Sequence, residues 1–136
     1  MLVIDASIAL SWVFPDEESA VANAVLDRLP VEAAIVPAVW SLEMTNALLI
    51  GERRGRLSRE QVADALAFLR RLPIEPAASA WDLDFGVVMS LARTHELTSY
   101  DAAYVELALR SSARLASLDS KMLQAAVEAG VRVVAV

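Results

Sequence analysis

Four carboxylates spread along the chain are the residues that could do chemistry together. Asp5 directly follows the apolar run 2–4, and Asp119 directly follows the apolar run 115–118. Considered alone, each reads as an ordinary helix N-cap. The carboxyl ends of parallel strands, however, share one edge of a sheet, and open α/β folds bind their ligands there. We therefore expect Asp5 and Asp119 to lie close together.

The other two acids lie in segments of helical composition. Asp101 stands three residues after Thr98, in the spacing of a capping box, so it also reads as a helix-start residue. Glu43 shares one face of a predicted helix with Trp40 and Asn46, each three residues away. An acid beside a tryptophan is poorly explained as part of a solvated face. We expect both acids to reach the same edge of the sheet.

Converging carboxylates predict a bound cation, because close like charges otherwise oppose folding. Ligands that are all oxygen select a hard ion, which makes Mg²⁺ or Mn²⁺ more suitable than zinc. Such an ion can activate a water and stabilise the leaving oxygen of a phosphodiester. The sequence therefore favours metal-assisted hydrolysis.

Competing chemistries lack their residues. The chain has no cysteine, so it has neither a thiolate nucleophile nor a disulfide. The single histidine, His95, is expected at the surface, and metal-free RNA cleavage usually needs two groups poised near neutrality. A serine triad lacks its Gly-x-Ser-x-Gly turn, and the four glycines form no phosphate-binding loop.

Composition predicts one folded domain over residues 1–136, of which 57% are hydrophobic. This apolar excess indicates either a rich core or a surface buried by a partner. We place Trp12, Phe14 and Trp40 in the core. No apolar run reaches the roughly 18 residues of a membrane span, and no basic leader precedes Asp5, so we expect a cytoplasmic protein without a membrane partner.

The net charge of −6 argues against loose electrostatic binding to nucleic acid. Arginines are concentrated at 53–59, which is either a solvated helix end or an edge that contacts phosphates.

Apolar patterns and helix-breaking residues divide the chain into alternating elements. We expect strands at 2–4, 33–36, near 74, 113–118 and 131–136, and helices at 6–14, 16–29, 39–54, 59–72, 80–95, 102–110 and 120–129. This alternation predicts an α/β fold with a mainly parallel sheet covered on both faces.

The ordered set of acidic motifs resembles the PIN-domain ribonucleases, and specifically the VapC-type toxins of bacterial and archaeal toxin–antitoxin pairs. The matching pieces are Val3-Ile4-Asp5-Ala6-Ser7, Glu43-Met44-Thr45-Asn46, Tyr100-Asp101-Ala102-Ala103-Tyr104 and Leu115-Ala116-Ser117-Leu118-Asp119. The resemblance implies a PIN-like three-layer α/β/α sandwich and a Mg²⁺- or Mn²⁺-dependent endoribonuclease.

The resemblance also implies roles for residues. The acidic site would comprise all four carboxylates: Asp5, Glu43, Asp101 and Asp119. Asp5 and Asp101 would be direct metal ligands. Ser7, Asn46 and Ser117 would hold carboxylates or waters; many relatives have threonine at the position of Ser117, so the hydroxyl is kept. The implied partners are an RNA substrate, a second copy in a homodimer, and a VapB-like antitoxin that wraps the toxin and plugs its site.

Three alternatives stay open. A PIN-like fold could be a non-catalytic binding module, although such a module should have lost at least one acid. A phosphatase of the haloacid dehalogenase type also has an Asp after its first strand, but it needs a second Asp where this chain has Ser7. The third alternative is an RNA-processing nuclease without an antitoxin.

Overall fold

A parallel sheet forms the centre of the protein, whose computed structural model describes residues 1–135. Its four strands are β1 (Leu2–Ile4), β2 (Ala34–Val36), β3 (Ile74–Pro76) and β4 (Arg114–Ala116), in the order β3-β2-β1-β4. Leu2 lies opposite Ala34 of β2, and Val3 lies opposite Leu115 of β4. The central strand β1 is fully enclosed, as expected of a run that is apolar on both faces.

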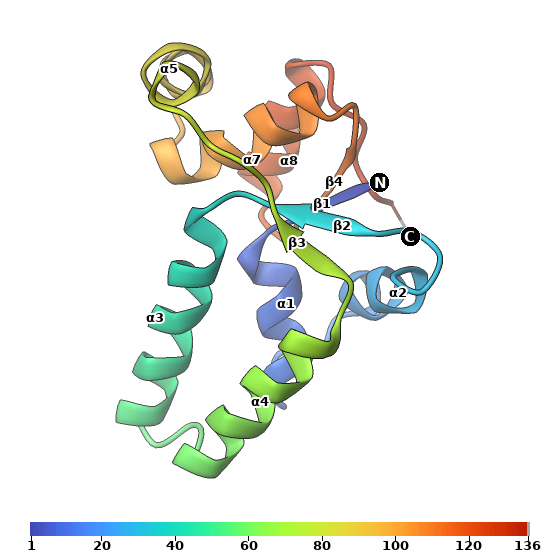
Figure 1. The fold of residues 1–136 in the computed structure, drawn as a ribbon, viewed down its shortest axis with the longest axis vertical. Coiled ribbons are helices and arrows are strands. Elements are labelled where there is room, and N and C mark those ends of the chain that lie inside the picture. Colours follow the sequence, from blue (N-terminus) through green and yellow to red (C-terminus); the bar gives the residue numbers. More distant parts are fainter. Residues whose placement is uncertain (136) are drawn as a thin grey trace.

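Helices cover both faces of the sheet, as Figure 1 shows. One face carries α1 (Ala6–Val13), α2 (Ala20–Arg28), α3 (Val39–Arg53) and α4 (Arg59–Arg71). The other carries α5 (Trp81–Leu83), α6 (Met89–His95), α7 (Ser99–Arg110) and α8 (Ser120–Glu128). The predicted α/β fold with a parallel sheet between two helical layers is confirmed. The expectation of a single domain stays a prediction.

Two apolar cores lie on opposite faces of β1, because successive strand residues point to opposite sides. Leu2 and Ile4 join the cluster that includes Ile8 of α1. Val3 joins the cluster that includes Tyr104 of α7. The strand therefore ties the N-terminal helices to the C-terminal ones.

Of the three large aromatic side chains placed in the core, Phe14 is buried, while Trp12 and Trp40 are partly buried and pack against the core clusters. Phe14 is buried in a cluster between α1, α3 and α4. Trp12 packs against two cores and donates its indole N–H to the Ala22 carbonyl at 2.8 Å. Trp40 packs where three cores meet. These side chains bind α1 to α3.

The predicted helix 16–29 begins later than expected. Ser19 is its N-cap and accepts a hydrogen bond from the Ala22 amide, so α2 starts at Ala20. Asp16 instead pairs with Arg56 at 2.8 Å, and the Arg56 guanidinium lies 4.3 Å from the centre of the Phe14 ring. Asp16, which we expected in the first turn of this helix, therefore forms a tertiary ion pair instead. The phosphate-contacting alternative for the arginines stays a prediction.

Two further elements differ from the predictions. The helix 80–95 contains a π-helical turn, η1 (Asp84–Val88), between α5 and α6. The strand 131–136 is wrong within the described residues, where only Val133 forms a bridge, to Leu115; Val136 lies outside the described residues. Val131 and Val134 are buried, and the amide and carbonyl of Leu115 hydrogen-bond to the Arg132 carbonyl and the Val134 amide, each at 2.9 Å. The segment therefore lies beside β4 through one isolated bridge and does not extend into a strand within residues 131–135.

Over residues 1–135 we find no helix with the length and apolar character that crossing a membrane requires.

Candidate active site

Asp5 is the most deeply enclosed of the four acids, at 4% exposure. It caps α1, and its Oδ1 accepts hydrogen bonds from the Ile8 amide at 3.2 Å and the Ser7 hydroxyl at 2.6 Å. Its Oδ2 accepts one from the Ser117 hydroxyl. Burial raises the pKa of Asp5, while the hydrogen bonds from Ser117 and Ser7 lower it. Both oxygens thus have donors that favour the ionised form.

The two hydroxyls have their protons directed at Asp5. Ser7 Oγ accepts the amide of Leu118, and Ser117 Oγ accepts the amide of Asp119, each at 2.9 Å. Because a serine hydroxyl has one proton, each is left to donate that proton to Asp5. This network joins the end of β1 to the turn that follows β4.

Asp119 caps α8 at the same edge of the sheet. Its Oδ1 accepts the amides of Lys121 and Met122 at 2.9 and 3.2 Å. Its charge contributes to the raised pKa of both Asp5 and Asp101. Asp119 therefore caps a helix and also contributes its charge to the acidic site, so the expected N-cap role and the expected site role are compatible.

Asp101 lies in the first turn of α7. Its amide donates to the Thr98 hydroxyl oxygen at 3.1 Å, as expected from the capping spacing. Burial raises the pKa of Asp101 and the charge of Asp119 raises it further, while Thr98 and Lys121 lower it. Asp101 is half-buried, so its carboxylate lies near another acid, Asp119, and is still accessible from solvent.

Glu43 reaches the site from the middle of α3. Burial raises the pKa of Glu43, and the charges of Asp101 and Asp5 raise it further. The Tyr104 hydroxyl opposes this rise by donating to Glu43 Oε1 at 2.6 Å. Burial and the nearby Glu43 strongly raise the pKa of Tyr104, so the phenol keeps its proton and remains a donor.

Tyr104 is the site residue that the sequence analysis missed. Its distance of three positions from Asp101 was the available signal, because helical residues three apart share a face. Asn46, which the sequence analysis included, is exposed and lines a cavity of about 360 Å³ together with Glu43. Its supporting role stays a prediction.

The four acids are connected by mutual repulsion, but they do not form a closed metal cage. Within residues 1–135, no three acidic or histidine side chains are grouped closely enough to hold an ion together. Mg²⁺ is usually bound through only one or two carboxylates and retains waters. The oxygen ligands that these acids offer suit such an ion, because hard cations prefer oxygen donors.

His95 is more enclosed than the sequence suggested. Its side chain is 10% exposed, and its Nδ1 lies 3.2 Å from Glu128 Oε2 of α8. The surface placement of His95 is therefore wrong, but its partner is a structural acid and not one of the four site acids.

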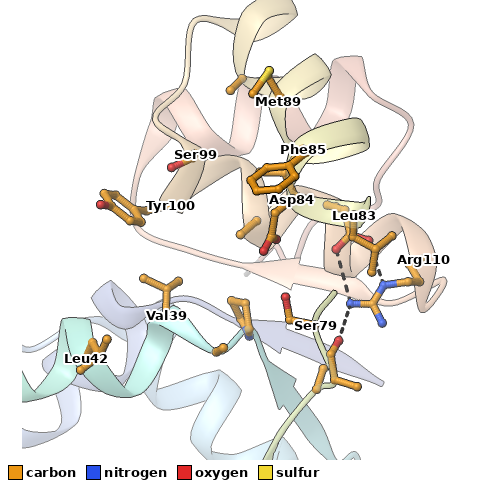
Figure 2. Close-up of a pocket in the computed structure, with 18 residues that line it drawn as sticks. Val39, Leu42, Ser79, Leu83, Asp84, Phe85, Met89, Ser99, Tyr100 and Arg110 are labelled. Atoms are coloured by element: carbon orange, nitrogen blue, oxygen red, sulfur yellow. Dashed lines mark hydrogen bonds and ion pairs between the residues drawn. The ribbon is translucent and has the colours of Figure 1, made fainter. Parts of the chain in front are cut away.

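A larger apolar hollow of about 540 Å³ was not predicted. Figure 2 shows Phe85 of η1 on one side of it and Val39 and Leu42 of α3 on the other. Phe85 is 67% exposed and Leu42 is 70% exposed. At the far end, Arg110 pairs with Glu106 at 2.8 Å. Exposed apolar side chains gathered around one hollow form the kind of patch that proteins often use to bind other molecules.

Comparison with known protein families identifies the family of this chain. The PIN domain model matches residues 2–128, and the chain belongs to the PIN domain family. It is 29% identical over 127 residues to Ribonuclease VapC3 of Pyrobaculum aerophilum, covering 90% of this chain and 92% of that relative.

Solved structures share the fold at low identity. VapBC2 from Rickettsia felis, bound to a DNA fragment from its promoter, has a TM-score of 0.71 at 10% identity, covering 98% of this chain and 96% of that one. VapC20 of Mycobacterium tuberculosis, a sarcin–ricin loop cleaving toxin, has a TM-score of 0.62 at 14% identity, covering 92% and 95%.

The raised pKa of Asp101 predicts a pH-dependent gain from Asp101→Asn in metal-free protein. A carboxyl whose folded pKa exceeds its unfolded value destabilises the fold as pH rises through the folded pKa. Asparagine does not ionise. The variant should therefore melt close to wild type at acidic pH, below the ordinary value of 3.8, and a few degrees higher at pH 7.

Thermal melts in EDTA across this pH range measure the effect. Asp64→Asn is the matched control, because Asp64 is exposed on α4, and it should give no such gain. If Asp101→Asn melts at or below wild type at pH 7, the acids are not crowded as described.

Proposed function

We propose that the chain is a divalent-cation-dependent endoribonuclease, the toxin of a VapBC-type pair, which hydrolyses RNA phosphodiesters at the four-carboxylate site. The observation that carries this proposal is that four separate segments bring their acids to one place, where burial and, to a smaller extent, the neighbouring acids raise the pKa of Asp5, Glu43 and Asp101. Membership in the PIN domain family and the similarity to Ribonuclease VapC3 support nuclease chemistry.

In this proposal Asp5, Glu43, Asp101 and Asp119 together hold Mg²⁺ or Mn²⁺, with Asp5 and Asp101 as its most direct ligands. The ion, when bound, supplies Lewis acidity for activating water and stabilising the leaving oxygen. The hydrogen bonds that Asp5 accepts favour its charged form and oppose the burial that raises its pKa. Glu43 is half-buried and burial raises its pKa, which suits its carboxylate to take a proton from the attacking water.

The alternative of a non-catalytic module is weakened because all four acids are present with their supporting donors. The haloacid dehalogenase alternative needs a second carboxylate where Ser7 stands, and Ser7 instead donates to Asp5. A processing nuclease without an antitoxin would use the same site. The presence or absence of an antitoxin therefore distinguishes a toxin from a processing nuclease.

RNA cleavage should depend on the acids and on the cation. With Mn²⁺ present, wild type should cut RNA, and EDTA should abolish cutting. Asp101→Asn should lower the rate by about 100-fold or more, on the scale of losing a group that acts in the reaction. His95→Ala should keep activity, because His95 contacts Glu128 and not the site.

Single-turnover assays on a labelled RNA, with circular dichroism as a check on folding, measure these rates. Cleavage that persists in EDTA or in Asp101→Asn would refute the metal-carboxylate mechanism. A folded wild type that cuts no RNA with Mn²⁺ would favour the binding module.

We also propose two protein partners, a second copy of the chain and a VapB-like antitoxin. The apolar hollow supports the second copy, since one face carries both a hollow and the projecting side chains of Phe85 and Trp81, which are 67% and 79% exposed. A two-fold interface requires such a self-complementary patch. The antitoxin is supported by the likeness to a toxin–antitoxin complex from Klebsiella pneumoniae, which has a TM-score of 0.67 at 15% identity.

Light scattering after size-exclusion chromatography should find two copies in wild type and one in Phe85→Asp. The control Val31→Asp changes a residue that is 90% exposed at the end of α2 and should leave the dimer intact. A small protein encoded beside this chain should add mass and suppress RNA cleavage. A monomeric wild type would refute the dimer, and unimpeded cleavage with that protein bound would favour a processing nuclease.

A further inference from the structure

We propose that Tyr104 is a positioning residue that fixes the Glu43 carboxylate and so determines which of its oxygens is offered to the cation and the attacking water. This inference rests on the proposed nuclease function and deepens it. It concerns a contact between two helices on opposite sides of the sheet, 61 positions apart in the chain.

The donor has a fixed position because the ring of Tyr104 belongs to the C-terminal core. Tyr104 is 1% exposed and packs in the same cluster as Val3, Leu115 and Met122. Side chains in close-packed cores are held in single rotamers. The hydroxyl at the end of this ring therefore reaches Glu43 Oε1 from a rigid support, at 2.6 Å.

Glu43 needs a donor from another element. Asp5 and Asp119 are N-caps, so free amides at the starts of α1 and α8 hold one oxygen of each. Glu43 lies inside α3, where the backbone amides already bond within the helix. A half-buried glutamate without a donor would sample several rotamers. Tyr104 thus supplies Glu43 with a fixed hydrogen-bond donor, as the amides at the helix starts do for Asp5 and Asp119.

The hydrogen bond also divides the two oxygens of Glu43 between two tasks. Oε1 accepts the hydrogen bond from the phenol, so we assign Oε2 to the site, where the charges of Asp101 and Asp5 act on the same carboxylate. Without the hydroxyl, either oxygen could turn to the site or away from it. The expected defect is a loss of orientation at Glu43 and not a loss of RNA binding.

Tyr104→Phe removes only this hydroxyl. Mn²⁺ affinity, followed by the electron paramagnetic resonance of free Mn²⁺, should weaken, and kcat should fall, each by about 10- to 100-fold, as for other residues that orient metal ligands. KM for RNA should stay the same. Tyr100→Phe is the matched control, because Tyr100 lies on the same helix and is 60% exposed, and it should match wild type.

A double-mutant cycle tests the route of the effect. In a Glu43→Ala background, Tyr104→Phe should change Mn²⁺ affinity no further, because its only proposed target is gone. Additive losses would show that the hydroxyl acts elsewhere and would overturn the inference.

Fluorine NMR gives a readout that does not depend on the Phe variant folding. Tyr100 and Tyr104 are the only tyrosines, so 3-fluorotyrosine in Tyr100→Phe protein labels position 104 alone. Its resonance should shift saturably with Mg²⁺, and this response should vanish in Glu43→Ala. An unresponsive resonance in protein that binds Mg²⁺ would overturn the inference.

The outcomes separate this inference from the proposed function. If wild type neither binds Mn²⁺ nor cuts RNA, the nuclease proposal fails. If wild type does both and Tyr104→Phe equals it in affinity and in kcat, only the positioning role of Tyr104 fails.

Discussion

The cost of burying carboxylates, and of keeping their like charges close together at one edge of the sheet, is the constraint on which the rest of the site depends. Burial and neighbouring acids raise the pKa of Asp5, Glu43 and Asp101. Moving a carboxylate out of water costs several kcal/mol in real proteins unless donors or a cation compensate. Hydrogen-bond donors offset part of this cost. Asp5 accepts from hydroxyls and from the Ile8 amide, and Glu43 accepts from the phenol of Tyr104.

The donors also connect the layers of the protein. Ser7 follows β1 and Ser117 follows β4, and both bond to Asp5, so the two neighbouring strands end in one network. Tyr104 belongs to the core on one face and bonds to Glu43 of a helix on the other. Site geometry is therefore a property of the packed core, and core substitutions near Tyr104 should act on the site as well as on stability.

Local sequence signals predicted much of this arrangement because they report local physics. The apolar run 2–4 predicted β1, and the helix expected at 59–72 is α4, which Ser58 opens in a capping box with Gln61. Asp5 and Asp119 were readable as caps, and the parallel sheet then implied a shared edge.

What the sequence could not predict depends on residues far apart in the chain. Asp16 does not start a helix but pairs with Arg56, 40 positions away. Tyr104 hydrogen-bonds to Glu43, 61 positions away. Propensity also cannot distinguish a π-helical turn such as η1 from an α-helix, because the composition is the same. Apolar residues at 131 and 134 signal burial equally well in a strand or in an irregular segment.

The central claim is that these carboxylates bind a divalent cation at the edge of the sheet. Crystals soaked in Mn²⁺ and measured at the manganese absorption edge would locate the ion directly. The account predicts an anomalous peak within coordination distance of Asp5 and Asp101, and no peak there in Asp101→Asn crystals. A wild-type crystal with no peak among the four acids, at a Mn²⁺ concentration that supports RNA cleavage, would contradict it.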